Sequence, residues 1–188
     1  MEEGLTKSTN LKNGLTFGLI IGLTYCISLF LRYNIASNPI VIGIIAIVFY
    51  LLIIGMLFFC GIKRRKDMGG FIDLKNAFQT IFVAVIIGEL IYTVFNFIYL
   101  KLIDPHYFEK FMAGMENWVE SSSMPDSQKE KTLDQMKSQI EKQQDWLTPA
   151  GFAKGYLIWV AITGVFGFIA ALIIRKRKVF EPLDNQSI

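Results

Sequence analysis

The sequence is poor in the residues that build metal sites and disulfides. Its 188 residues include one histidine, His106, and two cysteines, Cys26 and Cys60. A zinc site needs three or four protein ligands, so we expect no metal and no other cofactor. The spans proposed below place the two cysteines toward opposite faces of a membrane, which excludes a disulfide between them within one chain.

Recognisable catalytic motifs are lacking as well. The chain carries neither a phosphate-binding loop nor a dinucleotide-binding fingerprint, and Met68-Gly69-Gly70 reads as a turn. Asp104, Glu109 and Glu116 are acids that could pair for catalysis, but their spacing is typical of solvated helix faces. These absences disfavour an enzyme.

Charge is missing from half of the chain. Four windows, which together hold 94 residues, contain one charged residue, Glu89, whereas the other half holds 34: the windows are 13–31, 33–62, 76–100 and 155–174. A soluble domain does not separate charge in this way. The pattern excludes an ordinary cytosolic domain, a disordered chain and a disulfide-stapled secreted module, and it predicts an integral membrane protein.

Each window is long enough to cross a bilayer as a helix of about 20 residues. Helices are required because lipid offers no partners for backbone N–H and C=O groups. We therefore predict a single all-α membrane domain over 1–188 with four transmembrane helices, near 14–31, 39–62, 76–100 and 152–174. The first apolar run is too long for a signal peptide and lacks a clean cleavage site, so we expect an uncleaved anchor.

Basic residues predict the orientation of the spans. The link 63–75 carries five bases, the tail 175–188 opens with four, and the short link between the first two spans has only Arg32. The positive-inside rule then makes both termini and the basic link cytoplasmic, in a bacterial inner membrane. We expect these clusters to bind anionic lipid headgroups and not nucleic acid; their residues are Lys63, Arg64, Arg65, Lys66, Arg175, Lys176, Arg177 and Lys178.

The region between the last two spans is then external. From Asp104 to Asp145 it holds nine acids and five bases. Asp104-Pro105 is typical of a helix start, and Ser123, Pro125 and Asp126 suit a second one. Apolar residues recur at helical spacing in both halves, which predicts an amphipathic helical hairpin over 104–148. Two interpretations of its apolar stripes follow. The stripes pack on each other and on the ends of the spans, as a lid, or they dock a partner protein or the membrane surface.

Small residues repeat at intervals of three or four on three spans. This pattern lets helix backbones approach closely. We interpret it as packing within the bundle, with homodimerisation through the first span as the alternative. The residues are Gly14, Gly18 and Gly22 on the first span, Ala84 and Gly88 on the third, and Gly164 and Gly167 on the fourth.

The single intramembrane charge, Glu89, lies near mid-membrane on the third span. Tyr92, Thr93 and Asn96 follow it on the same helix face. A carboxyl group in this setting faces the protein interior or water and is a functional hypothesis by default. In its protonated form it could donate to a polar side chain of the first span: Tyr25, Thr24 or Ser28. Three interpretations of Glu89 follow: an interhelical hydrogen bond, a proton or ion site, and a contact with a polar ligand or a partner helix.

One set of short motifs resembles a known family. The stretch from Gly69-Gly70-Phe71 to Ala77-Phe78, the triplet Ile103-Asp104-Pro105 and the glycines of the first span resemble domain-of-unknown-function family 4199. The resemblance implies a small four-span bacterial inner-membrane protein without an agreed activity. It also implies an accessory role beside a membrane glycosyltransferase, and it carries no catalytic residues over to this chain.

Three functions follow as expectations. The first is a non-catalytic membrane accessory or scaffold protein that binds a membrane protein partner, or a second copy of itself, through the bundle or the hairpin. The alternative is a small transporter or ion-coupled permease that uses Glu89. The third is the binding of a lipid-linked substrate.

Overall fold

The computed structural model describes residues 2–34, 39–145 and 147–176, and within these ranges the chain is helical apart from short connections. Five helices and a π-helical turn precede the last helix. The elements are α1 (Glu2–Asn34), α2 (Pro39–Asp67), α3 (Leu74–Ile98), the π-helix η1 (Tyr99–Ile103), α4 (Tyr107–Ser121), α5 (Asp126–Asp145) and α6 (Pro149–Ile174).

Four of these helices are long and apolar enough to cross a membrane. They are Thr9–Asn34, Pro39–Asp67, Leu74–Ile103 and Pro149–Ile174. The predicted fold class, an all-α membrane protein with four spans and a helical hairpin between the last two, is confirmed. The helices continue beyond the predicted spans at most ends; α1, for example, begins at Glu2.

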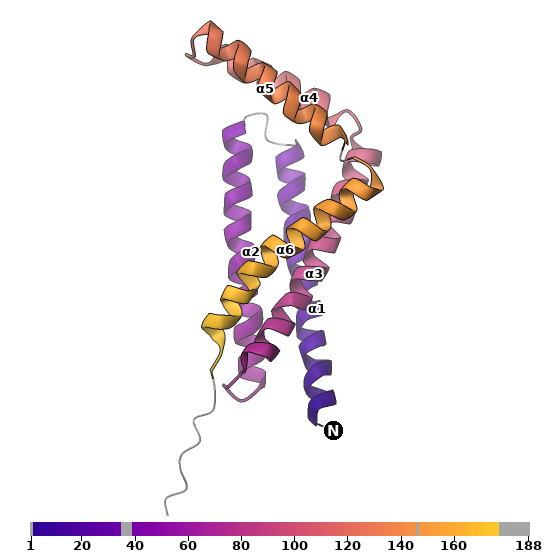
Figure 1. The fold of residues 1–188 in the computed structure, drawn as a ribbon, viewed down its shortest axis with the longest axis vertical. Helices are drawn as coiled ribbons and strands as arrows, with labels where there is room; N and C mark the ends of the chain where they lie inside the picture. The colour runs from indigo at the N-terminus through magenta and orange to yellow at the C-terminus, as the bar shows by residue number, and fades with distance from the viewer. Residues whose placement is uncertain (1, 35–38, 146, 177–188) are drawn as a thin grey trace, which may run out of the picture.

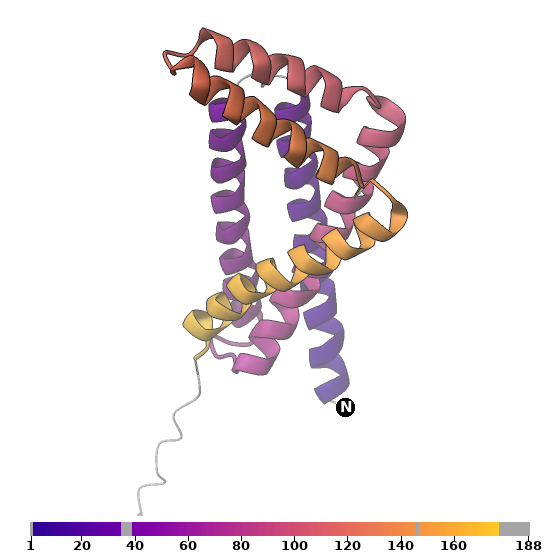
Figure 2. The same ribbon diagram turned by 45° about the horizontal axis from the view of Figure 1, so that its top comes forward.

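The spans form a bundle with the hairpin across one end. In Figure 1, α1 and α2 run upright while α3 and α6 cross them at an angle, and α4 and α5 lie over the end opposite the N-terminus. The tilted view in Figure 2 shows α4 and α5 running side by side across this end. Among the spans, α1 packs most extensively on α3, and α3 packs next most extensively on α6.

The predicted cytoplasmic regions meet at the other end, here called the basic end. Ile72 and Lys176 exchange two backbone hydrogen bonds of 2.9 Å, which fasten the α2–α3 link to the end of α6. The Asn13 side chain donates to Asp67 across 2.6 Å, which adds α1 to the same end. The three regions therefore share one end of the bundle, and its assignment to the cytoplasm stays a prediction.

Glycines on α1 permit its close packing on α3. A Cβ atom placed at Gly14 would lie 2.6 Å from Val83 Cβ, and one placed at Gly18 would lie 2.7 Å from Ile87 Cβ. Gly22 stands in the same relation to Ile91, at 2.6 Å from its Cδ1. Such distances are too short for any side chain, so the glycine face of α1 is occupied within this bundle.

Small residues on α3 and α6 also lie in close helix contacts. A Cβ at Gly88 of α3 would lie 2.7 Å from the Ile21 side chain, and Ala84 is fully buried. On α6, a Cβ at Gly167 would approach the Ile81 side chain to 2.9 Å, and one at Gly164 would lie 3.2 Å from the Phe82 ring. Small residues thus bring both α1 and α6 close to α3.

The apolar core lies in the basic half of the bundle. Every buried residue of α2 follows position 52, and every buried residue of α6 follows position 162. The first halves of these two helices contribute no buried residue, although both run beneath the hairpin. The bundle is therefore tightly packed at one end and open between α2 and α6 at the other.

The start of the hairpin differs from the prediction. The helix α4 begins at Tyr107, and its N-cap position is His106, whose side chain makes no capping hydrogen bond. Asp104 instead ends the π-helix, where its backbone N–H donates to the Tyr99 carbonyl across 2.8 Å. The expected start at Asp104 was wrong because the third span continues as η1 up to residue 103.

Candidate functional site

Two cavities occupy the open half of the bundle and share three lining residues. The lower cavity, of about 630 Å³, lies between α1, α2, α3 and α6. The upper cavity, of about 510 Å³, lies between these helices and the hairpin. Arg32, Tyr92 and Trp159 line both of them. The two cavities therefore meet at Arg32, near the hairpin end of α1.

The lower cavity is mostly apolar and opens sideways. Its walls include Ile47 and Leu51 of α2 and Ile162 of α6. These three side chains are also among the exposed apolar residues of the surface, at 62%, 63% and 41% exposure. Side chains that line a cavity and also face outward mark its mouth. In a membrane-spanning bundle this mouth faces lipid.

The floor of the lower cavity is polar and centres on Glu89, which is 1% exposed. The Tyr25 hydroxyl donates to Glu89 Oε1 across 2.8 Å, and the Thr163 hydroxyl donates to the same oxygen across 2.7 Å. Glu89 thereby joins α1, α3 and α6. Of the other two residues expected near it, Thr24 donates to the Ile20 carbonyl, and Ser28 lines the cavity.

The rest of the predicted polar stripe also faces the cavities. Tyr92 lines both, and its ring lies 5.0 Å from that of Tyr25 between centroids. Thr93 and Asn96 line the upper cavity. Asn96 Oδ1 accepts a hydrogen bond of 2.6 Å from the Tyr33 hydroxyl. The structure thus brings all four stripe residues to one continuous surface inside the bundle.

The hairpin roofs the upper cavity with its apolar stripe. Phe108, Phe111 and Met115 of α4, with Met136 and Ile140 of α5, line it. This is the lid arrangement among the alternatives that the stripe left open.

An aromatic contact holds the roof to α1. The Tyr107 ring lies 4.3 Å from that of Tyr33 between centroids. Burial raises the pKa of the Tyr107 hydroxyl to about 12, so this hydroxyl is neutral at physiological pH.

Arg32 is the functional candidate that the sequence did not single out. Among the described residues that line the cavities it is the only cation, and Glu89 is the only acid. Its guanidinium interacts with the Tyr92 hydroxyl, but its Nε is buried without a hydrogen-bond partner among the described residues. In the sequence, Arg32 is the only base in the short link between the first two spans, and it served only to predict the orientation of the spans in the membrane. Its position against a cavity required the fold.

A second buried group without a partner lies on the floor. The Tyr50 hydroxyl is near Thr163 but makes no hydrogen bond with the described residues. Leaving a buried hydroxyl unpaired costs roughly 1–3 kcal/mol. The floor therefore presents one tyrosine that is fully engaged, Tyr25, and one that is not.

This difference predicts opposite responses to the same substitution. We expect Tyr25→Phe to lower the free energy of unfolding by about 1–2 kcal/mol, because Glu89 loses a donor. Tyr50→Phe removes an unpaired hydroxyl and is expected to leave stability unchanged or slightly higher. Denaturation of both variants in mild-detergent micelles measures the difference. Equal losses would contradict the hydrogen-bond assignment at Glu89.

The expected headgroup residues differ in their exposure. Lys63, Lys66, Arg175 and Lys176 are exposed, and Arg65 is half-buried and donates to the Ile174 carbonyl across 3.2 Å. Arg64 is 3% exposed, and its Nε donates to Asn10 Oδ1 inside the bundle. This burial argues against a headgroup role for Arg64. Arg177 and Lys178 lie outside the described residues.

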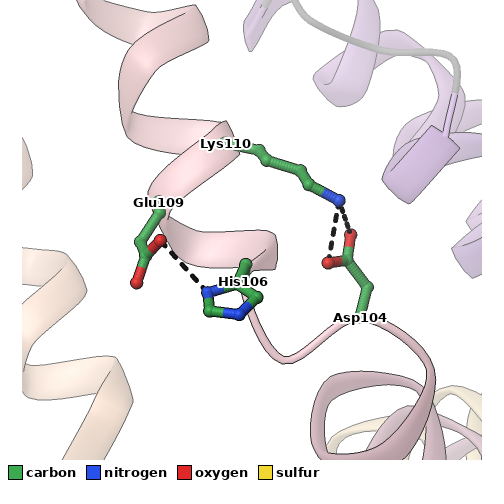
Figure 3. Close-up of polar contacts among 4 residues, drawn as sticks. All are labelled: Asp104, His106, Glu109 and Lys110. Carbon is green, nitrogen blue, oxygen red and sulfur yellow. Dashed lines mark hydrogen bonds and ion pairs between the residues drawn. The ribbon is translucent and has the colours of Figure 1, made fainter.

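The three acids considered for catalysis, Asp104, Glu109 and Glu116, each contact a base and not one another. Lys110 contacts both carboxylate oxygens of Asp104, at 2.9 and 3.0 Å, and Glu109 lies 3.2 Å from His106 (Figure 3). Glu116 faces Lys137 of α5 at 3.5 Å. Among the described residues, no group of three or more histidine, cysteine or acidic side chains gathers in a metal-binding arrangement. Paired surface charges of this kind do not form a catalytic carboxylate pair.

Comparison with known proteins gives a family but no closer relative. The chain has no match among curated proteins or among solved structures. One family model matches residues 12–176, which cover the hairpin and all four spans apart from the first three residues of the span Thr9–Asn34. The chain therefore belongs to the family described as "Protein of unknown function (DUF4199)".

Proposed function

We propose that this chain is a non-catalytic membrane accessory protein that holds an amphipathic ligand from the bilayer in its two joined cavities. The observation that carries the proposal is the lower cavity itself, an apolar space with a mouth between α2 and α6 and a charged residue where it meets the upper cavity. Its volume of about 630 Å³ falls in the range of small-molecule sites, about 300–1,000 Å³.

The arrangement of the walls suits one long apolar group and one polar group. The apolar part would lie against Ala46, Ile47 and Phe166 in the lower cavity, at the depth of the hydrocarbon core. The polar part would lie at Arg32 and in the upper cavity, where Asn96, Gln139 and Tyr156 add polar groups. A partner membrane enzyme, such as the glycosyltransferase that the family resemblance implies, would reach the ligand through the mouth.

The proposed membrane placement follows the basic residues. The exposed bases Lys63, Lys66, Arg175 and Lys176 support a cytoplasmic location of the basic end in a bacterial inner membrane, with the hairpin outside. The transport alternative has weaker support. Both hydrogen bonds described for Glu89 come from neighbouring helices, one from α1 and one from α6. This arrangement favours a residue that positions these helices over one that carries a proton or an ion.

Filling the lower cavity tests the proposal. In micelles of an uncharged sugar detergent, a diacylglycerol with a diazirine at the end of one chain should photolabel the cavity faces of α2 and α6. Ala46→Phe places a ring in the cavity and is expected to lower this labelling about tenfold, the effect of 1.4 kcal/mol. Labelled peptides are quantified by mass spectrometry.

The matched control is Val48→Phe on the same helix. Val48 is 54% exposed and lines neither cavity, so we expect labelling to stay at the wild-type level. Equal labelling of the wild type and Ala46→Phe, or labelling spread evenly around α2, would overturn the proposed function.

A further inference from the structure

We propose that Arg32 binds the phosphate of an anionic lipid whose acyl chain lies in the lower cavity. This inference rests on the proposed function and adds the chemical class of the ligand. It starts from the position of Arg32, which lines both cavities two residues before the end of α1.

The depth of Arg32 matches the polar–apolar boundary of a membrane. The span that includes it ends at Asn34, and Trp159, which is 42% exposed, lines both cavities at the junction. Aromatic side chains of this kind gather at the membrane interface. A lipid that enters through the mouth would therefore have its headgroup level with Arg32 and its chains level with Ile47 and Leu51.

No described residue balances the charge of Arg32 by an ion pair. The Arg32 Nε also has no hydrogen-bond partner among the described residues. Glu89, the only acid among the described residues that line the cavities, is held by Tyr25 and Thr163 at the floor. Tyr25 precedes Arg32 by seven residues on α1, so the Cα atoms of these two residues are about 10 Å apart along the helix.

A phosphate is the group that fits this setting. Guanidinium groups bind phosphate through two parallel N–H···O bonds, and such charge-assisted bonds are stronger than neutral ones. Tyr92, which also lines both cavities, places a hydroxyl beside the same guanidinium. A neutral lipid would fill the lower cavity equally well but would leave the Arg32 charge unmatched.

Two probes that differ only in phosphate test the inference. Diacylglycerol and phosphatidic acid with the same diazirine-bearing chain are compared in uncharged sugar-detergent micelles. For the wild type we expect phosphatidic acid to reach half-maximal labelling of the cavity at a mole fraction about tenfold lower. Equal mole fractions would overturn the inference and leave the proposed function standing, whereas failure of both probes to label the cavity would overturn the proposed function.

Variants of Arg32 separate charge recognition from cavity shape. Arg32→Gln is expected to bring phosphatidic acid to the diacylglycerol value without changing the latter, and Arg32→Lys to restore part of the preference. A folded Arg32→Gln protein that loses both labels would overturn the inference, because Arg32 would then shape the cavity. Thermal denaturation monitors folding of each variant.

Two controls exclude other sources of the preference. Lys101 is an exposed base on η1 that lines neither cavity, so Lys101→Gln should keep the tenfold preference. An equal loss in Lys101→Gln would assign the effect to general surface charge and overturn the inference. Excess inorganic phosphate should not displace phosphatidic acid; displacement would assign the site to free phosphate and overturn the lipid assignment.

Discussion

Gly18→Val is expected to lower the free energy of unfolding by about 3 kcal/mol, because a β-branched side chain cannot fit between α1 and α3. Even a Cβ atom at this position would lie 2.7 Å from Ile87 Cβ and 3.1 Å from the Ala84 carbonyl oxygen. These neighbours are a branched side chain and backbone, so relief requires the helices to separate. Overpacking of this kind costs about 1–3 kcal/mol, and backbone contacts put Gly18 at the upper end.

The control carries the same substitution at a helix position that is not crowded. A Cβ atom at Gly55 of α2 would meet nothing within 4 Å, so Gly55→Val should change stability by less than about 1 kcal/mol. Unfolding in mild-detergent micelles by added dodecyl sulfate measures both. Equal stability of the two variants would contradict the packing described for α1.

The same experiment addresses homodimerisation through the first span. If the glycine face joined two chains, Gly18→Val would lower the oligomeric state while each monomer kept its stability. Close packing of Gly14, Gly18 and Gly22 on α3 predicts the reverse, a destabilised monomer. Size-exclusion chromatography with light scattering distinguishes the two outcomes.

Glu89→Leu is expected to lower the free energy of unfolding by about 3 kcal/mol, the second large effect. Leucine has nearly the same volume but accepts no hydrogen bond, so the Tyr25 and Thr163 hydroxyls both lose their acceptor. Each buried hydroxyl left unpaired costs roughly 1–3 kcal/mol. The dodecyl sulfate titration used for Gly18→Val measures this loss as well.

Glu89→Gln provides the matched comparison. The glutamine carbonyl accepts from the same two hydroxyls, so we expect a loss of less than about 1 kcal/mol. A glutamine variant as unstable as the leucine variant would show that stability depends on the ionisable group itself. That result would contradict the positioning role of Glu89 and favour the transport alternative.

Much of the fold can be predicted from the sequence because membranes restrict the choices. Segments with one charge in 94 residues lie in lipid, where a helix satisfies every backbone N–H and C=O group. The five bases of the link 63–75 mark the boundary between the second and third spans. The spacing of Gly14, Gly18 and Gly22 indicated a close helix contact. It did not indicate which helix would be the partner, since the small residues of α3 and α6 offered two.

The cavities could not be predicted from the same patterns. Periodicity says which face of a helix is apolar, but in a bilayer an apolar face may meet lipid or protein, and α2 is apolar all round. The helices α2 and α6 meet at the core, to which Leu57 and Ala170 belong, and the lower cavity lies between them in the other half. Arg32 became a functional candidate only because the helices separate beside it. No sequence pattern pairs Thr163 with Glu89.

Two local predictions failed or changed for reasons that are also physical. Asp104-Pro105 has the composition of a helix start, but the preceding helix uses Asp104 for its own end. Arg64 belongs to a run of four bases, and a run gives no clue to which member faces inward. Its contact with Asn10 depends on the position of α1 at the basic end.

The sideways mouth between α2 and α6 determines which concentration of the proposed ligand controls its binding, the concentration in the membrane or the one in water. A molecule that enters past Ile47 and Leu51 comes from the bilayer plane, so occupancy depends on its mole fraction among the surrounding lipids and not on its concentration in water. Diluting the membranes in buffer would leave the site as full as before. Changing the lipid composition, with the protein concentration held constant, would empty or fill it.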